Sequence, residues 1–450
     1  MILNKKVLLK FFFICLISVS FFLGYFLREN AVGGGLEFFD MEWVTIQSLR
    51  NDFFYTINNY GRFRDYTMPF PYILCAFLNP FSNDVENFQL SNTIISFSIF
   101  IILSVAIKKK FFNIKSVDAL LLSSVILILP FFRTSAFWGK QENLGWLFLI
   151  IALIFFNEIK KNIKKPFSNR DLVNVILFCF ASACALYARQ ALFFLPVSYL
   201  LYLFFNNANK KIIITSIISF AVFSIPGFLL MWIWGSIFHE VPGMEPWGSF
   251  FGGWINYSHI LKNLPIILSF FGFYLLPILM IEFLNTGFKN FFYKYFKSFF
   301  FVLIILIIFM QSNLLDYLGN YYHGGGAVLK VNYLIEKNNF FLLLIFSAIG
   351  ASILIRFFKE DAKNNLIMFL PLIIIYGFPK ILGQEYMEPL ILLMFFLGIK
   401  TDLHKIYFKS VSLSNCILIS YFAIYLIGSI YFKHFAFSSY EEWKIFLNAQ

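Results

Sequence analysis

The chain has 450 residues, of which 60% are apolar and 13% are charged, and its formal net charge is +12. Soluble domains carry roughly a quarter charged residues, so this composition excludes an ordinary soluble enzyme or binding module. The positive charge does not indicate a nucleic-acid partner, because lysine and arginine collect in short segments between apolar runs, as membrane topology requires. The five cysteines are scattered and odd in number, which argues against a disulfide framework.

The first thirty residues combine a basic flank with a long apolar stretch. A signal peptide is one interpretation, but the apolar part is long for one and no A-x-A cleavage site follows. We favour an uncleaved first span over about residues 7–27. Lys5, Lys6 and Lys10 then place the N-terminus in the cytoplasm.

A long outer segment is predicted over residues 28–91. It contains eight acidic residues and four arginines, and this balance suits the outer side. Within it, residues 66–81 are apolar with a proline near each end, and they are short for a span. We predict an interfacial helix there, lying along the outer surface.

Twelve further apolar runs follow, and basic segments alternate with segments of mixed charge between them. The runs lie near residues 92–107, 117–132, 144–157, 172–187, 190–205, 212–234, 264–284, 298–311, 339–355, 365–378, 389–399 and 411–432. The basic segments, which we assign to the cytoplasm, read KKKFFNIK, EIKKNIKKPFSNR, NNANKK, FKNFFYKYFK, RFFKEDAKNN and KTDLHKIYFK. The pattern predicts one all-α polytopic membrane domain over 1–450 with about 13 transmembrane helices (range about 11–14), two or three of them short enough to be re-entrant.

The unusual polar residues fall in the predicted outer segments, while the middles of the spans are almost free of charge. Ionisable groups inside a membrane mark ion or proton paths, so the pattern favours an outer-face cavity over an ion-coupled transporter. No P-loop is present, and Gly324–Gly326 lack the strand and helix of a dinucleotide site. Because nucleotide-activated sugars are cytoplasmic, a transferase facing outward needs a donor that the membrane presents, and a polyprenyl-phosphate sugar fits.

The pair Asp40 and Glu42 forms a D-x-E motif shortly after the first span. In an extended segment both side chains share a face, whereas on a helix they point about 160° apart. One interpretation is a general base for an acceptor hydroxyl, and the other is a solvated acidic loop. Arg189 is likewise either a bidentate phosphate ligand or an interfacial anchor, and Glu142 is either a site residue or an ordinary loop charge.

These features resemble the GT-C glycosyltransferases, and several stretches are similar to the dolichyl-phosphate-glucose α-1,2-glucosyltransferase family. The family has an acidic pair in its first luminal loop and a glutamine seven residues after the first acid. The stretch FFDMEWVTIQ has Asp40 and Gln47 at that spacing, although Met41 separates its two acids. RDYTMPFPY resembles the family's Asp before a Thr-Pro-Pro-Gly helix start, without the glycine. LPFFRTSAFWG resembles its leucine-proline-aromatic span end, and YARQ its Arg-Gln-Thr-Asn motif without Thr-Asn. LLDYLGNYYH (314–323) is weakly similar to the family's late Leu-Leu-Ala-Asp-Asn-Arg-His segment.

The resemblance implies an inverting single displacement from a polyprenyl-phosphate sugar onto a glycan or lipid-linked acceptor at the outer or luminal face. It implies Asp40 as general base, Glu42 or Asp65 as a second acid, and Arg189 as a ligand of the leaving phosphate with Lys330 and Lys380. The further residues predicted to bind substrate are Gln47, Gln190, Glu142, His323 and Glu385. No cofactor is predicted, and the acids are the one set that could hold a divalent metal. The composition indicates a bacterial relative in the inner membrane, using an undecaprenyl-linked donor; a eukaryotic one would lie in the endoplasmic reticulum.

Three alternatives stay open. A lipid-linked glycan flippase or exporter would need a polar path through the span centres. An envelope polymerase or ligase would favour a large late outer loop with several arginines. A non-catalytic assembly subunit would not need Asp40, Asp65 and Arg189.

Overall fold

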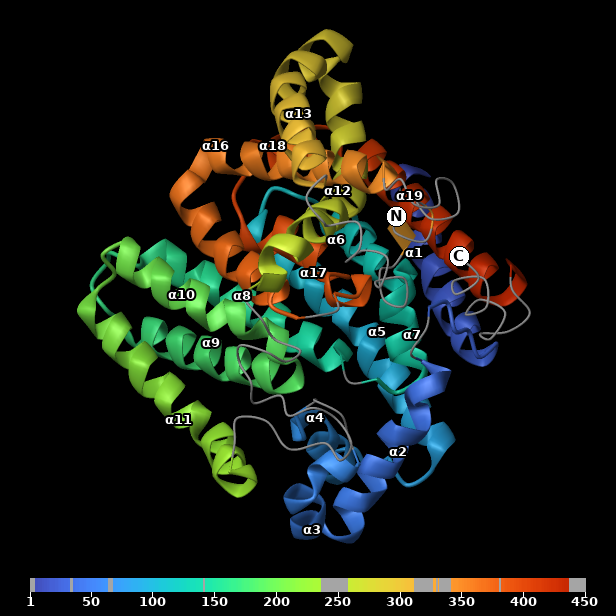
Figure 1. Cartoon of the computed structure of the whole chain (residues 1–450), viewed down its shortest axis with the longest axis vertical. Helices are drawn as coiled ribbons and strands as arrows, with labels where there is room; N and C mark the ends of the chain where they lie inside the picture. Colours follow the sequence, from blue (N-terminus) through green and yellow to red (C-terminus); the bar gives the residue numbers. More distant parts are fainter. Residues whose placement is uncertain are drawn as a thin grey trace. The chain divides into compact units, whose positions relative to one another are not determined.

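The elements of the computed structural model within its described ranges are helices, and the chain forms two compact units, Met1–Gly253 and Trp254–Gln450 (Figure 1). Each unit is treated by itself below. The ranges described are residues 5–32, 35–63, 68–140, 142–235, 258–310, 327–328, 331, 341–379 and 382–436.

Unit 1 begins with α1 and a group of short helices, and continues with longer apolar ones. The helices are α1 (Lys5–Phe26), α2 (Leu36–Asn51), α3 (Phe53–Asn58), α4 (Phe70–Ile73), α5 (Val85–Lys110), α6 (Ser116–Ser123), α7 (Pro130–Phe137), α8 (Glu142–Asn162), α9 (Asn169–Ala188), α10 (Phe194–Phe205) and α11 (Lys210–Trp234). In Figure 1, α9 lies between α8 and α11 and packs against both. Asp84 caps α5 by accepting a hydrogen bond from the Asn87 N–H at 2.9 Å, and this bond lowers the pKa of the Asp84 carboxyl.

Unit 2 is built around one long helix pair. Its helices are α12 (Ser258–Thr286), α13 (Phe288–Met310), α16 (Phe341–Gly377), α17 (Leu390–Leu393), α18 (Asp402–Lys409) and α19 (Val411–Tyr431). The segment Met394–Gly398 continues α17 as a π-helical turn, and α16 is interrupted by non-helical backbone at Asp361.

Nine helices in the described part of the chain are long and apolar enough to cross a membrane, or ten if the bent pair α6–α7 counts as one span. The fold is therefore that of a polytopic helical membrane protein. The difference from thirteen predicted runs arises at four places. Two runs merge into α16, the run near 117–132 is bent by 72° after Ile128, and the helical stretches 190–205 and 390–398 are short.

Three segments that the charge pattern predicted as loops are helical for most of their length. Residues 288–297 belong to α13, residues 356–365 lie within α16 apart from the break at Asp361, and residues 402–409 form α18. The first is explained by aromatic residues at i, i+4 spacing: the rings of Phe288, Phe292 and Phe296 follow one another at 5.7 and 4.4 Å. Residues 70–78 are also helical, as predicted within 66–81.

The basic segments assigned to one side of the membrane contact one another within unit 1. Lys10, near the start of the first span, pairs with Asp118 at 2.5 Å, just after the segment KKKFFNIK. The Asn209 N–H, within NNANKK, donates to the carbonyl of Ile163, within EIKKNIKKPFSNR, at 3.1 Å. These contacts agree with the predicted alternation, because each joins two segments assigned to the same side.

The α12–α16 crossing depends on two glycines. A Cβ atom at Gly272 would lie 2.0 Å from the Phe346 carbonyl oxygen, and one at Gly350 would lie 1.9 Å from that of Leu268. Ser347 strengthens the crossing by donating its hydroxyl to the Pro265 carbonyl at 2.6 Å. Small residues let helix backbones approach closely where the hydrophobic effect between spans is weak.

We predict that Gly350→Ala destabilises the protein by about 1–3 kcal/mol or more, because backbone must move to admit the methyl group. The matched control is Gly428→Ala in α19, where a Cβ meets nothing within 4 Å. Thermal unfolding of both purified variants in detergent measures the difference. Equal melting temperatures would show that the close crossing is not needed.

Candidate functional site

Helix α2 carries Asp40 and Glu42 on different faces. Glu42 is 2% exposed and shares the buried face with Ile46 and Leu49, both fully buried, while Asp40 is exposed. The D-x-E motif is thus helical, and its two acids diverge as that geometry requires. Asp40 is the solvent-accessible acid of the pair, and Glu42 faces the protein.

An arginine absent from the predicted site holds α2 in place. Arg50 donates from Nε to the Ala76 carbonyl at 2.7 Å, and from Nη1 to the Ser82 carbonyl and to Asn83 Oδ1. Gln47, one turn earlier, donates to the same Ser82 carbonyl at 3.4 Å. Both side chains bind backbone groups that follow α4, so they fix the acid-bearing helix against the apolar stretch 70–78.

The first outer segment is also fixed at its start. Arg133, 1% exposed, makes a bidentate ion pair with Glu29, with N–O distances of 2.7 and 2.6 Å. The same guanidinium donates to the carbonyls of Ser20 and Leu127, and Trp138 donates to the Glu29 carbonyl at 2.9 Å. This arrangement makes Arg133 an assembly residue that joins α1, α7 and the outer segment.

Helix α4 links α2 to the helix end that bears Arg189. It packs against both α2 and α9, and the Phe70 ring lies 5.9 Å from that of Tyr187 and 6.2 Å from that of Phe148. The Tyr187 hydroxyl inserts between two backbone groups of α11 that are four residues apart. It donates to the Phe223 carbonyl and accepts from the Gly227 N–H. The outer segment is therefore bound to the ends of α8 and α9 that the charge pattern placed on its side.

Arg189 ends α9 and is 7% exposed. Its guanidinium carbon lies 4.6 Å from the ring centroid of Trp146, within cation–π distance. The close approach of Arg189 to α8 is helped by Gly145, because a Cβ atom at Gly145 would lie 3.2 Å from the Cβ atom of Arg189. Arg189 is thus seated on the first turns of α8, the helix that Glu142 begins, and Gln190 follows it in a 3-10 turn. The geometry brings Arg189, Gln190 and Glu142 into one region.

Several predicted site residues are not placed. Asp65, His323, Lys330 and Lys380 lie outside the described residues. Glu385 is half-buried in unit 2. Its neighbours Gln384 and Glu388 belong to a buried polar cluster there.

That cluster joins three elements of unit 2. Glu388, 1% exposed, accepts a hydrogen bond from the Tyr274 hydroxyl of α12 at 2.6 Å. Gln384 donates to the hydroxyls of Tyr274 and Tyr425 at 2.7 and 2.9 Å, and accepts from the Ala327 N–H at 2.5 Å. The contacts tie the buried stretch before α17 to α12 and α19.

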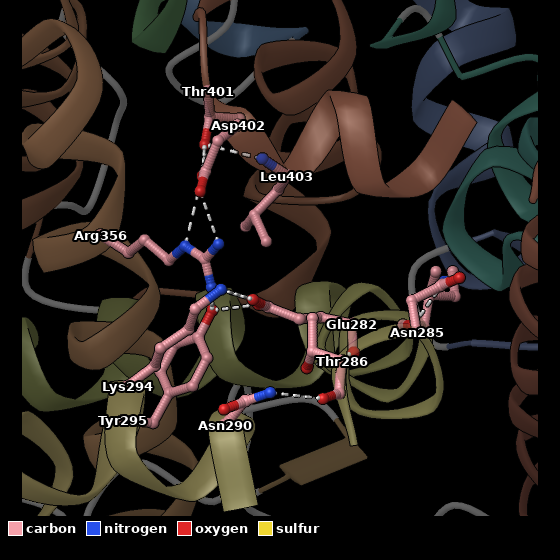
Figure 2. Close-up of polar contacts among 11 residues, drawn as sticks. Glu282, Asn285, Thr286, Asn290, Lys294, Tyr295, Arg356, Thr401, Asp402 and Leu403 are labelled. Atoms are coloured by element: carbon pink, nitrogen blue, oxygen red, sulfur yellow. Dashed lines mark hydrogen bonds and ion pairs between the residues drawn. The ribbon is translucent and has the colours of Figure 1, made fainter. Parts of the chain in front are cut away.

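A second network in unit 2 is ionic, and Figure 2 shows it around Arg356. Arg356 donates to Glu282 and, through Nη2, to Asp402 at 2.6 Å, while Lys294 and Tyr295 donate to Glu282 at 3.1 and 2.6 Å. Burial alone would raise the pKa of the Asp402 carboxyl, but hydrogen bonds from Arg356 outweigh it and lower that pKa. The network joins α12, α13, α16 and α18.

The sequence contained a partial signal for the ionic network. Glu282 lies inside an apolar run and Arg356 directly after one, and charges in such positions are costly unless paired. Their pairing with each other and with Asp402 could not be predicted, because it depends on how four helices meet. The role of Arg50 had no signal in the sequence, since its partners are mainly backbone carbonyls.

Comparison with protein-family models, with characterised proteins and with solved structures returned no match for this chain. Within the described residues, no group of three or more His, Cys, Asp or Glu side chains is arranged to hold a metal ion.

Proposed function

We propose that the protein is a GT-C-type glycosyltransferase that uses a polyprenyl-phosphate sugar at the outer membrane face. The observation that carries the proposal is the arrangement in unit 1. An accessible acid, Asp40, is held on α2, and α4 connects α2 to the helix end where Arg189 lies on Trp146. An acid for the acceptor and a cation for a phosphate are the two groups that this transfer needs.

In the proposed reaction, Asp40 takes the proton from an acceptor hydroxyl as that oxygen attacks the sugar C1. The new glycosidic bond forms while the C1–O bond to the polyprenyl phosphate breaks, and the configuration at C1 inverts. Arg189 stabilises the charge on the departing phosphate. Glu42, from the buried face, orients α2 and the acceptor subsite, and Asp65 of the same unit is proposed to complete the acceptor contacts.

The proposal includes a topology of about 13 spans with the N-terminus in the cytoplasm and residues 28–91 outside, and a place in the bacterial inner membrane. It is supported by the way the first outer segment contacts one set of helix ends. Glu29 binds Arg133, α4 meets Tyr187, and the Trp234 indole donates to the Ile57 carbonyl at 2.9 Å. Arg133 lies in a segment assigned to the outer side, and Tyr187 and Trp234 are the last residues of runs that end on that side.

One observation favours the alternative of a lipid-linked glycan exporter. Tyr274 lies near the middle of α12 and holds the buried carboxylate of Glu388, and polar groups at such depth are typical of transport paths. Glu388→Gln separates the two functions. An exporter should lose transport in proteoliposomes, whereas a transferase whose site lies in unit 1 should keep its sugar-transfer rate.

The first prediction of this proposal concerns topology. Glu86→Cys and Lys161→Cys, both at exposed positions, should be labelled by an impermeant maleimide from opposite sides of the membrane. The exposed native Cys15 and Cys416 are first replaced by serine to remove background. Labelling from the same side would move the candidate site to the cytoplasm and exclude the proposed donor.

The second prediction concerns the acids and is tested with purified protein and a panel of polyprenyl-phosphate sugars. Asp40→Asn should lower turnover by about 10²–10⁴-fold while donor binding survives, because general-base catalysis contributes on that scale. Glu42→Gln, the matched control, should reduce turnover less. If Glu42→Gln is the more damaging in a folded protein, the base is Glu42. If neither variant is slower, the D-x-E motif is not catalytic.

The third prediction concerns the phosphate. Arg189→Lys keeps the charge but loses the planar fork and the stacking on Trp146, so it should weaken donor use by about 1–3 kcal/mol. The measurement is kcat/KM for the donor, with Arg170→Lys as the control, since Arg170 is an exposed residue at the opposite end of α9. Unchanged kinetics for a folded Arg189→Lys variant would make Arg189 an interfacial anchor only.

A further inference from the structure

The helix ends that meet at the ionic network of unit 2 are strongly basic. Residues 282–297, 356–363 and 400–409 contain nine lysines and arginines against four acidic residues. The surface formed by the exposed Lys289, Lys297, Lys359, Lys400 and Lys409 is called the basic rim below. It is separate from the candidate transferase site, which lies in unit 1.

Three of the four acids of these segments are paired with cations within the protein. Glu282 is fully buried and accepts hydrogen bonds from Arg356, Lys294 and Tyr295. Asp402 accepts from Arg356, and Glu360 lies 3.4 Å from the Lys405 ammonium. The charge presented outward by the rim is therefore mainly that of its lysines.

The network also fixes the elements that carry the rim. Arg356 of α16 grips Glu282 of α12 and the first residue of α18, while Tyr295 holds α13 to the same glutamate (Figure 2). Thr401 caps α18 by accepting from the Leu403 N–H. The lysines thus belong to helices anchored at a common point.

Helix α18 has the form of a short interfacial helix. It buries Leu403, His404 and Tyr407, with the His404 imidazole 2.8 Å from the Phe395 carbonyl, and exposes Lys405 and Lys409. A helix with an apolar inner face and lysines outside suits the headgroup layer of a membrane.

Next to the lysines of α13 runs an exposed apolar row. Phe292, Phe296 and Phe300 stack along the helix with ring centroids 4.4 and 4.5 Å apart, and each is at least 40% exposed. A cationic surface continued by an apolar helix face matches a ligand with an anionic head and hydrocarbon chains. An acidic protein or a nucleic acid would match only the charge.

We propose that the basic rim binds the headgroups of anionic phospholipids, with the acyl chains against the aromatic row of α13. Juxtamembrane lysines attract anionic lipid surfaces, and each contributes roughly a fivefold factor in binding. The rim therefore selects phosphatidylglycerol-type lipids over zwitterionic ones, and this selection is independent of sugar transfer.

The test is titration of the purified full-length protein with phosphatidylglycerol and with phosphatidylcholine, with bound lipid measured by native mass spectrometry. Wild-type protein should prefer phosphatidylglycerol. The triple variant Lys297→Gln, Lys400→Gln, Lys409→Gln should lose that preference by on the order of 10²-fold, and each single variant by roughly fivefold.

The matched control neutralises three exposed lysines of unit 1, Lys164→Gln, Lys165→Gln and Lys211→Gln. It should keep most of the preference. Equal losses in the two triple variants, or no loss in the first, would overturn the assignment to the rim. If the first triple variant does not fold, the three single variants decide the question by the same criterion.

Discussion

Pairing of buried charge is the constraint on which the described structure depends. In a chain this apolar, an unpaired ion inside the protein would cost several kcal/mol. Arg133 and Arg356 are both buried, and each meets this constraint through carboxylates distant in sequence: Glu29 for the first, Glu282 and Asp402 for the second. Each pair therefore fixes the meeting point of several helices. Such pairs are weak evidence for net stability, but they specify which helix ends belong together.

The sequence predicted where the apolar helices lie better than where they stop. Runs of apolar residues identify spans because the bilayer requires them, and α5, α8, α9, α11, α12 and α19 follow the predicted runs. The predicted helix ends were wrong where lysine-rich segments are themselves helical. At residues 288–297 aromatic residues stack at i, i+4, and at 402–409 an apolar face packs inward. Charge alone places a segment at the surface without stating its backbone conformation.

The candidate site was predicted in part. The D-x-E motif could lie in an extended segment or on a helix, and the helical outcome separates an exposed Asp40 from a buried Glu42. The sequence also singled out Arg189, but not Trp146 beneath it or Gly145, whose missing side chain admits it. These contacts join α8 to the end of α9 and depend on tertiary packing. The backbone-binding role of Arg50 was equally invisible, because any arginine in an outer segment has the same sequence signature.

The two polar networks of unit 2 bear on the competing interpretations. Tyr274, which holds Glu388, and Glu282, which holds Arg356, lie on the same helix α12, eight residues or about 12 Å apart. The residues between them on α12 include the buried Leu275, Ile278 and Ile281. A transport path that connects the two networks would require water to enter this buried apolar stretch. In the described conformation each network is a separate set of polar contacts that holds helices together. One set lies beside α17 and the other lies at the basic rim. Contacts that stay formed suit a transferase, which needs a fixed scaffold. An exporter would have to break at least one of the two networks during transport.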